Sequence, residues 1–235
     1  MHSYDVIVNF FKQGGFFLYP IAMIWLIGIA IAIERFVYLT RVGAGNKSFW
    51  DELQPLFEAG NFRQAINIAK DSDTALAQIM RYGLSRIQSA RRREDIEKAM
   101  EESLVEVIPK LERRTHYLAA LANIGMLMGL FGTVLGLINA FAAVAQANPA
   151  EKASLLSASI SVAMNNTALG LLSAITLLLA HLYLETKTTN IVDSLEVATV
   201  KFLSSLGERK SDGELQQSAP VAPPGARPAA GGARA

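Results

Sequence analysis

The apolar stretch from Leu118 to Ala145 constrains this chain more than any other part of its sequence. It is long enough to cross a bilayer, because a spanning helix needs about 20 apolar residues. Four glycines follow at steps of four, three and four, which places them on one helix face: Gly125, Gly129, Gly132 and Gly136. Small residues let helix backbones approach closely in lipid. The stretch therefore predicts a membrane helix packed tightly against the third span or another subunit, with one hydroxyl, Thr133, beside the glycines.

Two further stretches, 16–39 and 155–183, have the same apolar character, which predicts an all-α integral membrane protein with three transmembrane helices. The first could be mistaken for a signal peptide. It lacks a basic region before it and a small-residue cleavage site after it, so we interpret it as a retained helix. The chain contains no cysteine, which excludes disulfides and thiolate metal sites. We expect neither a cofactor nor a metal ion.

Lysines and arginines gather between the first two spans, whereas the short turn 146–154 carries only Lys152. The positive-inside rule therefore predicts that the middle segment and the C-terminus are cytoplasmic, with the N-terminus and the turn outside. Acidic residues nearly balance the basic ones in the middle segment. We therefore expect a solvated domain there and no binding of nucleic acid.

These patterns predict an order of segments along the chain. They are an outer interfacial segment (1–15), transmembrane helices (16–39, 118–145 and 155–183), a cytoplasmic helical region (40–117), an outer turn (146–154), a cytoplasmic helix (184–210) and a disordered tail (211–235). Helical spacing predicts short helices at 49–59, 62–71 and 74–89. It also predicts that the second and third spans continue without a break into a cytoplasmic helical bundle. The tail is rich in Pro, Ala and Gly and cannot bury a core.

Polar side chains inside the spans are costly, so they mark either function or helix packing. The third span carries Asn165, Asn166 and Thr167 in succession, with Gly170 one turn further on. A simple explanation is that hydroxyls bond to their own helix and asparagines hold helices together. Three adjacent polar residues cannot all face one neighbour, however, which favours a surface lined by water or by a partner.

Charged residues are absent from the middle of every predicted span. If protons or sodium ions cross the membrane here, the carboxylate that binds them must come from another chain. Glu34 and Arg35 stand at the end of the first span, where we expect them to form a local ion pair.

The order of these parts resembles the TolQ/ExbB/MotA proton-channel family. The resemblance rests on Glu34-Arg35, the long middle segment, the motif Gly129–Gly136 and the motif Asn166–Leu171, and it covers roughly residues 15–205. Three spans fit its TolQ/ExbB branch. The resemblance implies an inner-membrane homopentamer whose central pore holds a dimeric, single-span TolR/ExbD-like partner with a membrane aspartate. Ion flow past that aspartate would turn the pentamer about the dimer and drive work on the cell envelope, with an outer energy-receiving protein as a further partner.

The family's two pore threonines correspond to Thr133 and Thr167, and the resemblance implies an ion pathway formed by these residues together with Asn166. The residues expected to pack the helices are Gly125, Gly129, Gly132, Gly136 and Gly170. The chain departs from the family pattern at Val162, where many members have glutamate, and at Thr176, where they have proline. The pore then has no carboxylate of its own. The coupling ion and the driven process (outer-membrane transport, envelope integrity or gliding motility) stay open.

A second hypothesis is a non-conducting oligomeric membrane scaffold, in which the glycines serve assembly only. Such a scaffold does not need Thr133 and Thr167 at one depth in the membrane. An intramembrane enzyme has no support, because the chain lacks an H-E-x-x-H motif, a G-x-S-x-G motif and a pair of intramembrane aspartates. We therefore expect no enzymatic activity.

Overall fold

The computed structural model describes residues 15–86 and 93–217, and the regular secondary structure in these ranges is entirely α-helical. The helices within them are α2 (Leu18–Ala59), α3 (Phe62–Asp71), α4 (Ala75–Arg86), α5 (Arg93–Glu112), α6 (Thr115–Gln146) and α7 (Lys152–Gln217). The predicted all-α class is confirmed. The outer interfacial segment predicted at 1–15 falls on residues outside the described ranges, apart from Gly15.

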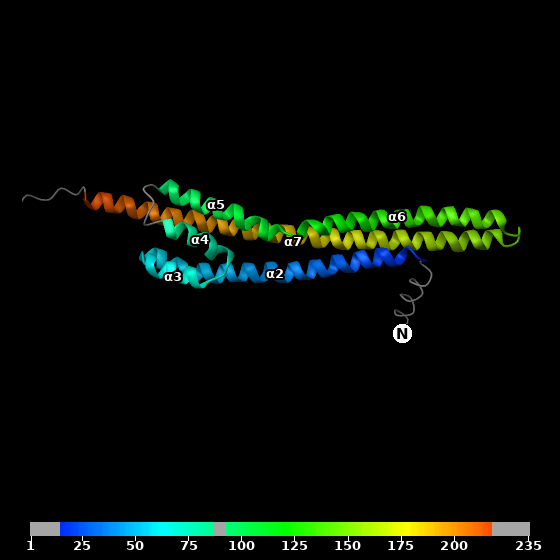
Figure 1. Cartoon of the computed structure of the whole chain (residues 1–235), viewed down its shortest axis with the longest axis horizontal. Helices are drawn as coiled ribbons and strands as arrows, with labels where there is room; N and C mark the ends of the chain where they lie inside the picture. The colour runs from blue at the N-terminus through cyan, green and yellow to red at the C-terminus, as the bar shows by residue number, and fades with distance from the viewer. Residues whose placement is uncertain (1–14, 87–92, 218–235) are drawn as a thin grey trace, which may run out of the picture.

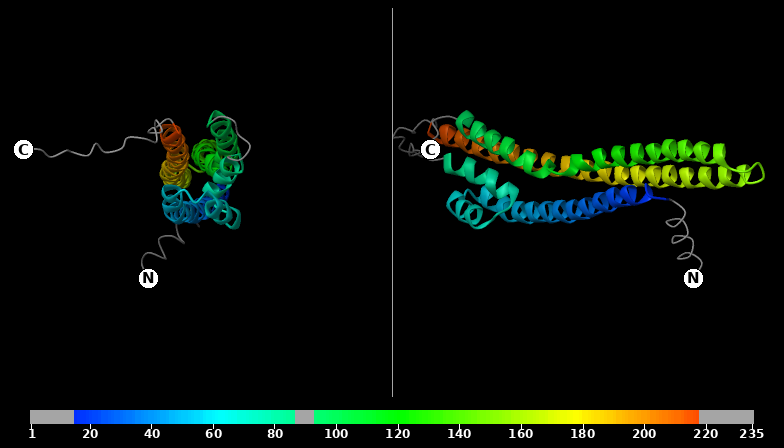
Figure 2. Two further views of the ribbon diagram at one scale, coloured as in Figure 1. Left: turned by 90° about the vertical axis from the view of Figure 1, so that its left-hand side faces the viewer. Right: turned by 45° about the vertical axis from the view of Figure 1, so that its right-hand side comes forward.

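The molecule is elongated, and its long axis follows α7 (Figure 1). Helices α6 and α7 form an antiparallel hairpin, and α2 runs along α7 on the other side (Figures 1 and 2). Helix α7 has 66 residues, which corresponds to roughly 100 Å at 1.5 Å per residue. At the end opposite the hairpin turn, α3, α4 and α5 pack against the C-terminal parts of α2 and α7.

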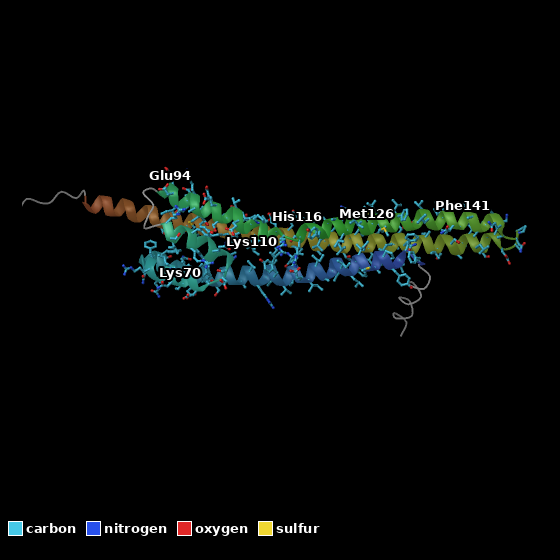
Figure 3. The ribbon with its side chains drawn as sticks, in the orientation of Figure 1. Lys70, Glu94, Lys110, His116, Met126 and Phe141 are labelled. Carbon is cyan, nitrogen blue, oxygen red and sulfur yellow. The ribbon has the colours of Figure 1, made fainter. Side chains whose placement is uncertain are left out.

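Within the described residues, three helical stretches are long and apolar enough to cross a membrane: one in Leu18–Ala59, one in Glu94–Gln146 and one in Lys152–Ser205. This confirms the prediction of three helices suited to a bilayer. Figure 3 shows the charged Lys70, Glu94 and Lys110 at the bundle end and Met126 and Phe141 on the hairpin. Large apolar side chains point outward from α6, including Leu127 and Phe141. An apolar surface of this extent is typical of contact with lipid or with other subunits.

Helix α2 does not stop at the predicted end of the first span. It continues through residues 40–48 and includes the short helix predicted at 49–59, so that one helix runs to Ala59. Residues 40–48 contain no proline, and a helix interior tolerates Gly43 and Gly45 at a cost of about 1 kcal/mol each. The helix ends at Gly60, whose φ of 73° is easy only for glycine.

The predicted unbroken connection between the middle segment and the second span is wrong. Helix α5 ends at Glu112 and α6 begins at Thr115, and Arg114 between them has a φ of 71°, unusual for a residue with a side chain. Two residues of α2 contact this turn. The carboxylate of Glu34 accepts hydrogen bonds from Arg114 at 3.2 Å, and the buried guanidinium of Arg35 donates to the carbonyl of Leu111.

Glu34 and Arg35 therefore contact the α5–α6 turn. The predicted ion pair between Glu34 and Arg35 is also wrong.

The connection between the third span and the helix that follows it is as predicted, because α7 continues without a break. It ends only at Gln217, inside the range 211–235 expected to be disordered. Glu, Lys, Arg and Gln favour helix there, and the proline-rich sequence starts only at Pro220. Residues 218–235 lie outside the described ranges.

The bundle end contains most of the buried apolar core. The rings of Phe57 on α2 and Phe202 on α7 lie 4.8 Å apart between their centres, and Met80 and Met100 are fully buried in the same cluster. This packing fixes α3, α4 and α5 to the long helices. It thereby ties the bundle to the same helix, α7, that carries Thr167 in the membrane-spanning hairpin.

Candidate ion-pathway site

The hairpin of α6 and α7 is in backbone contact at its centre. A Cβ atom built on Gly129 would lie 2.9 Å from the Cα of Gly170, and one built on Gly170 would lie 2.8 Å from the Cα of Gly129. Real Cβ contacts are not this short. Only glycine at both positions therefore lets the two helices approach this closely, as small residues do in membranes.

The other three glycines of α6 also face α7 of the same chain. A Cβ on Gly125 would lie 2.7 Å from the hydroxyl of Ser173, one on Gly132 would lie 3.0 Å from the Asn166 side chain, and one on Gly136 would lie 2.8 Å from the Cβ of Ala163. The structure thus turns the glycine face toward the third span, which is one of the two neighbours that the sequence allowed.

The hairpin brings Thr133 and Thr167 together. Their Oγ1 atoms are in direct hydrogen-bond contact, and both residues are half-buried. The hydroxyl of Thr133 lies 3.1 Å from the carbonyl oxygen of Gly129 and 3.4 Å from that of Ala163. The hydroxyl of Thr167 lies 3.3 Å from the carbonyl oxygen of Gly129. The glycine contact is the reason for this geometry, because it places the two threonines at one depth.

Each hydroxyl has one proton to donate and two lone pairs to accept. The pair therefore offers acceptor capacity beyond the bonds that it makes with its own helices. Because both residues keep part of their surface exposed, a side chain from another molecule can approach them. The pair can donate to a carboxylate, accept from a carboxylic acid or contribute oxygens to a cation shell.

Asn166 occupies a different position from the two threonines. It is buried, it packs against Gly132, and its Oδ1 atom has no hydrogen-bond partner among the described residues. The structure therefore places this amide within the contact between α6 and α7, away from the half-exposed surface of the threonines. Its part in ion passage stays a prediction.

The structure also locates the two departures from the family pattern. Val162 approaches the N-terminal end of α2, where its Cγ1 atom would lie 3.3 Å from a Cβ on Gly15. Thr176 accepts a hydrogen bond of 2.8 Å from the indole of Trp25. The residue that replaces the family's proline thus links α7 to α2, because its hydroxyl provides an acceptor that proline lacks.

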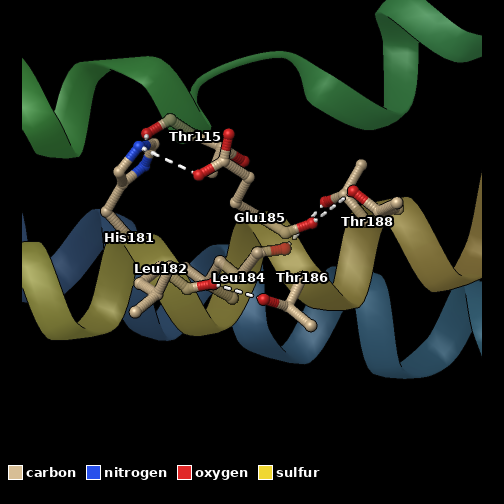
Figure 4. Close-up of polar contacts among 8 residues, drawn as sticks. Thr115, His181, Leu182, Leu184, Glu185, Thr186 and Thr188 are labelled. Carbon is tan, nitrogen blue, oxygen red and sulfur yellow. Dashed lines mark hydrogen bonds and ion pairs between the residues drawn. The ribbon is translucent and has the colours of Figure 1, made fainter.

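A polar cluster around His181 lies where α6 begins, beside the α5–α6 turn (Figure 4). The Nδ1 atom of His181 is 3.2 Å from the carbonyl oxygen of Thr115, and its Nε2 atom is 3.6 Å from a carboxylate oxygen of Glu185. These groups line a cavity of about 80 Å³ together with Glu112 and His116. The four-residue spacing of His181 and Glu185 indicates a shared helix face. The neighbouring sequence does not indicate which residues of another helix contact that face. Among the described residues, no cluster has the arrangement of a metal site.

Comparison with known proteins identifies relatives along most of the chain. The MotA/TolQ/ExbB proton channel family matches residues 71–197. An ExbB homolog of biopolymer transport from Methanothermobacter thermautotrophicus is 26% identical over 209 residues, which are 84% of this chain and 69% of the relative. An ExbB-like biopolymer transport protein from Synechocystis sp. is 26% identical over 172 residues, or 72% of this chain and 81% of the relative.

The Tol-Pal system protein TolQ of Haemophilus influenzae is 28% identical over 165 residues, which cover 66% of this chain and 72% of the relative. The family match covers more than half of the chain, and it includes the threonine pair and the glycines of the hairpin. The resemblance seen in the sequence is thereby confirmed: the chain belongs to the MotA/TolQ/ExbB proton channel family.

Proposed function

We propose that this chain is the ring-forming subunit of an inner-membrane motor driven by an ion gradient. In this proposal it conducts protons or sodium ions with a dimeric, single-span TolR/ExbD-like partner, and it couples their flow to work on the cell envelope. The observation that carries the proposal is the half-exposed pair of Thr133 and Thr167 at the centre of the hairpin, in a chain of a proton channel family.

The chemistry of the pair supports a partner that carries the charge. The second and third spans contain no charged residue, so the threonines can relay or coordinate an ion but cannot bind it alone. A membrane aspartate on the partner supplies the missing carboxylate. The hydroxyls then stabilise both of its forms, because each can donate to the carboxylate and accept from the protonated acid.

The outer surface of the hairpin supports assembly into a ring. Once α7 covers the glycine face, α6 still exposes large apolar side chains such as Leu130, Ile138 and Phe141. This surface suits lipid on one side and neighbouring copies on the other. We propose a homopentamer, whose central pore is lined by the half-exposed threonines of five subunits.

Reconstitution tests the conducting function against the scaffold alternative. Proteoliposomes that contain the chain together with its single-span partner are expected to pass ions down an imposed gradient, measured with an internal pH or sodium dye. An Asp→Asn change in the partner's membrane helix is expected to stop the flow. A complex that assembles but passes no ions under either gradient would instead support the scaffold. Comparing the two gradients identifies the coupling ion.

The orientation in the membrane is a separate prediction from the Lys/Arg distribution. A reporter fused after Ala90 is expected to be cytoplasmic, and one inserted beside Asn148 is expected to be external. A pair of enzymes that are active on opposite sides of the membrane gives the readout. The reverse pattern would overturn the proposed topology, with the N-terminus outside and the C-terminus inside.

A further inference from the structure

Two cavities follow each other along the groove between α2 and α7. The first is lined by Ile33 and Phe36 of α2 and by Ala180 and Tyr183 of α7, and the second begins one turn further along at Lys187. On both helices the lining positions recur at steps of three and four, so the two cavities share one side of the helix pair. They lie in line along one groove, apolar in the first cavity and polar in the second, with Lys187 of α7 reaching Thr40 of α2 between them.

The first cavity lies within the membrane-spanning stretches and is apolar. Its volume is about 320 Å³, and nearly all of its wall is aliphatic or aromatic, including Ile29, Leu177 and Leu184. Its two hydroxyl-bearing residues are Thr176 and Tyr183, and the hydroxyl of Thr176 accepts a hydrogen bond from Trp25. The cavity therefore suits a hydrocarbon chain and offers little to a polar ligand.

The second cavity lies just beyond the spans and is basic. It has a volume of about 540 Å³, and its wall carries Lys47, Lys187 and Lys201 but only one acid, Asp193. Within the described residues, none of these lysines forms an ion pair. Three ammonium groups without a carboxylate partner give the cavity a positive field that attracts anions.

A buried amide in the second cavity also lacks an acceptor. The Oδ1 atom of Asn46 accepts a hydrogen bond of 3.1 Å from the backbone N–H of Leu76, which fixes the orientation of the side chain. Its Nδ2 atom is buried and has no hydrogen-bond partner among the described residues. An unsatisfied buried donor is costly, and an oxygen of a bound anion would satisfy it.

Lys187 stands at the junction of the two cavities. Its Nζ atom donates a hydrogen bond of 2.5 Å to the hydroxyl of Thr40 and lies 4.4 Å from the ring centre of Phe36, which lines the apolar cavity. A lysine ammonium has three donors. The hydroxyl of Thr40 and the ring of Phe36 thus position the ammonium group of Lys187 where the apolar cavity ends and the basic cavity begins.

We propose that this groove binds one acidic phospholipid from the leaflet at the bundle end. One acyl chain occupies the apolar cavity, and the phosphate lies between Lys187, Lys47 and the Nδ2 atom of Asn46. The charge pattern selects the ligand, because a zwitterionic lipid has no net negative charge to match three unpaired lysines. A soluble phosphate has nothing to place in the apolar cavity.

Native mass spectrometry of the full-length chain in detergent tests this site. With equal amounts of phosphatidylglycerol and phosphatidylcholine added, the chain is expected to retain mainly phosphatidylglycerol. Lys187→Gln is expected to lower that retention about fivefold, the effect of one basic residue at an anionic surface. It should leave phosphatidylcholine retention and the melting temperature unchanged. Lys70→Gln on α3, outside both cavities, is the matched control and is expected to change neither lipid.

Ala180→Trp tests the apolar half of the groove without changing any charge. The indole would fill the first cavity, so phosphatidylglycerol retention is expected to fall to the level of phosphatidylcholine. Equal retention of the two lipids by the unmodified chain would overturn the proposal, and would point to a second copy of the chain in the groove. Unchanged retention in either Lys187→Gln or Ala180→Trp would overturn it as well.

Discussion

The double substitution Thr133→Val and Thr167→Val is expected to stop ion flow while the complex remains assembled. Valine keeps the shape of threonine and removes the oxygen that the proposed mechanism needs. One hydrogen bond to a charged group is worth about 1.5–3 kcal/mol, so the loss of both is expected to slow transport by tenfold or more. Ion flux in proteoliposomes with the single-span partner gives the measurement, and size-exclusion chromatography reports assembly.

Two variants separate the loss of the pair from a general effect of removing a hydroxyl. Thr167→Ser keeps the oxygen and is expected to retain partial flux. Thr199→Val removes a buried hydroxyl that bonds to its own helix, at 2.9 Å from the carbonyl oxygen of Leu195, far along α7 from the pair. It is expected to leave flux unchanged. Near-normal flux in the double variant would mean that the threonines only bond to their helices, and the proposed pathway would be rejected.

Gly129→Ala is expected to destabilise the hairpin by about 1–3 kcal/mol, the usual cost of overpacking a tight contact. The new Cβ would meet the backbone of Gly170 and the carbonyl oxygen of Asn166 at 2.9 Å, and neither can rotate away as a side chain could. Gly129→Leu is expected to prevent the hairpin from closing. It would then also separate Thr133 from Thr167. Thermal unfolding in detergent, followed by circular dichroism, measures the effect.

Gly43→Ala is the matched control, because it makes the same chemical change in another long helix. A Cβ there would lie 3.7 Å from the side chain of Ile191, which is an ordinary contact. Alanine is the better helix former by about 1 kcal/mol, so this variant is expected to be neutral or slightly more stable. Equal melting temperatures for the two alanine variants would contradict the close contact at Gly129.

The sequence predicts the membrane-spanning stretches well, because long apolar stretches need no tertiary information to be recognised. The spacing of the glycines also indicates a shared helix face, and Gly129 and Gly170 do meet at the centre of the hairpin. The turn at Arg114 could not be predicted in this way. It is associated with contacts from Glu34 and Arg35, which are remote in sequence and come close only when α2 packs beside α6 and reaches the end of α5.

Around the candidate site, too, some residues can be predicted from the sequence and others cannot. The threonines can be predicted from their own motifs, since each follows a recognisable glycine or asparagine pattern. The cluster around His181 and the basic groove near Lys187 cannot, because both depend on how α7 is rotated relative to its neighbours. Side chains on one helix face are readily inferred from spacing, whereas the residues that face them from another helix are not.

The continuity of α7 has a mechanical consequence. No proline interrupts it between the threonine site and the bundle, and sharp kinks in helices occur mainly at prolines and similar defects. Thr167 and Phe202 therefore belong to one rod, separated by roughly 52 Å at 1.5 Å per residue. A tilt of a few degrees at the threonine end displaces the bundle end by several ångströms. A continuous helix of this length would act as a lever, through which a small movement at the threonine site would reach the distant bundle directly.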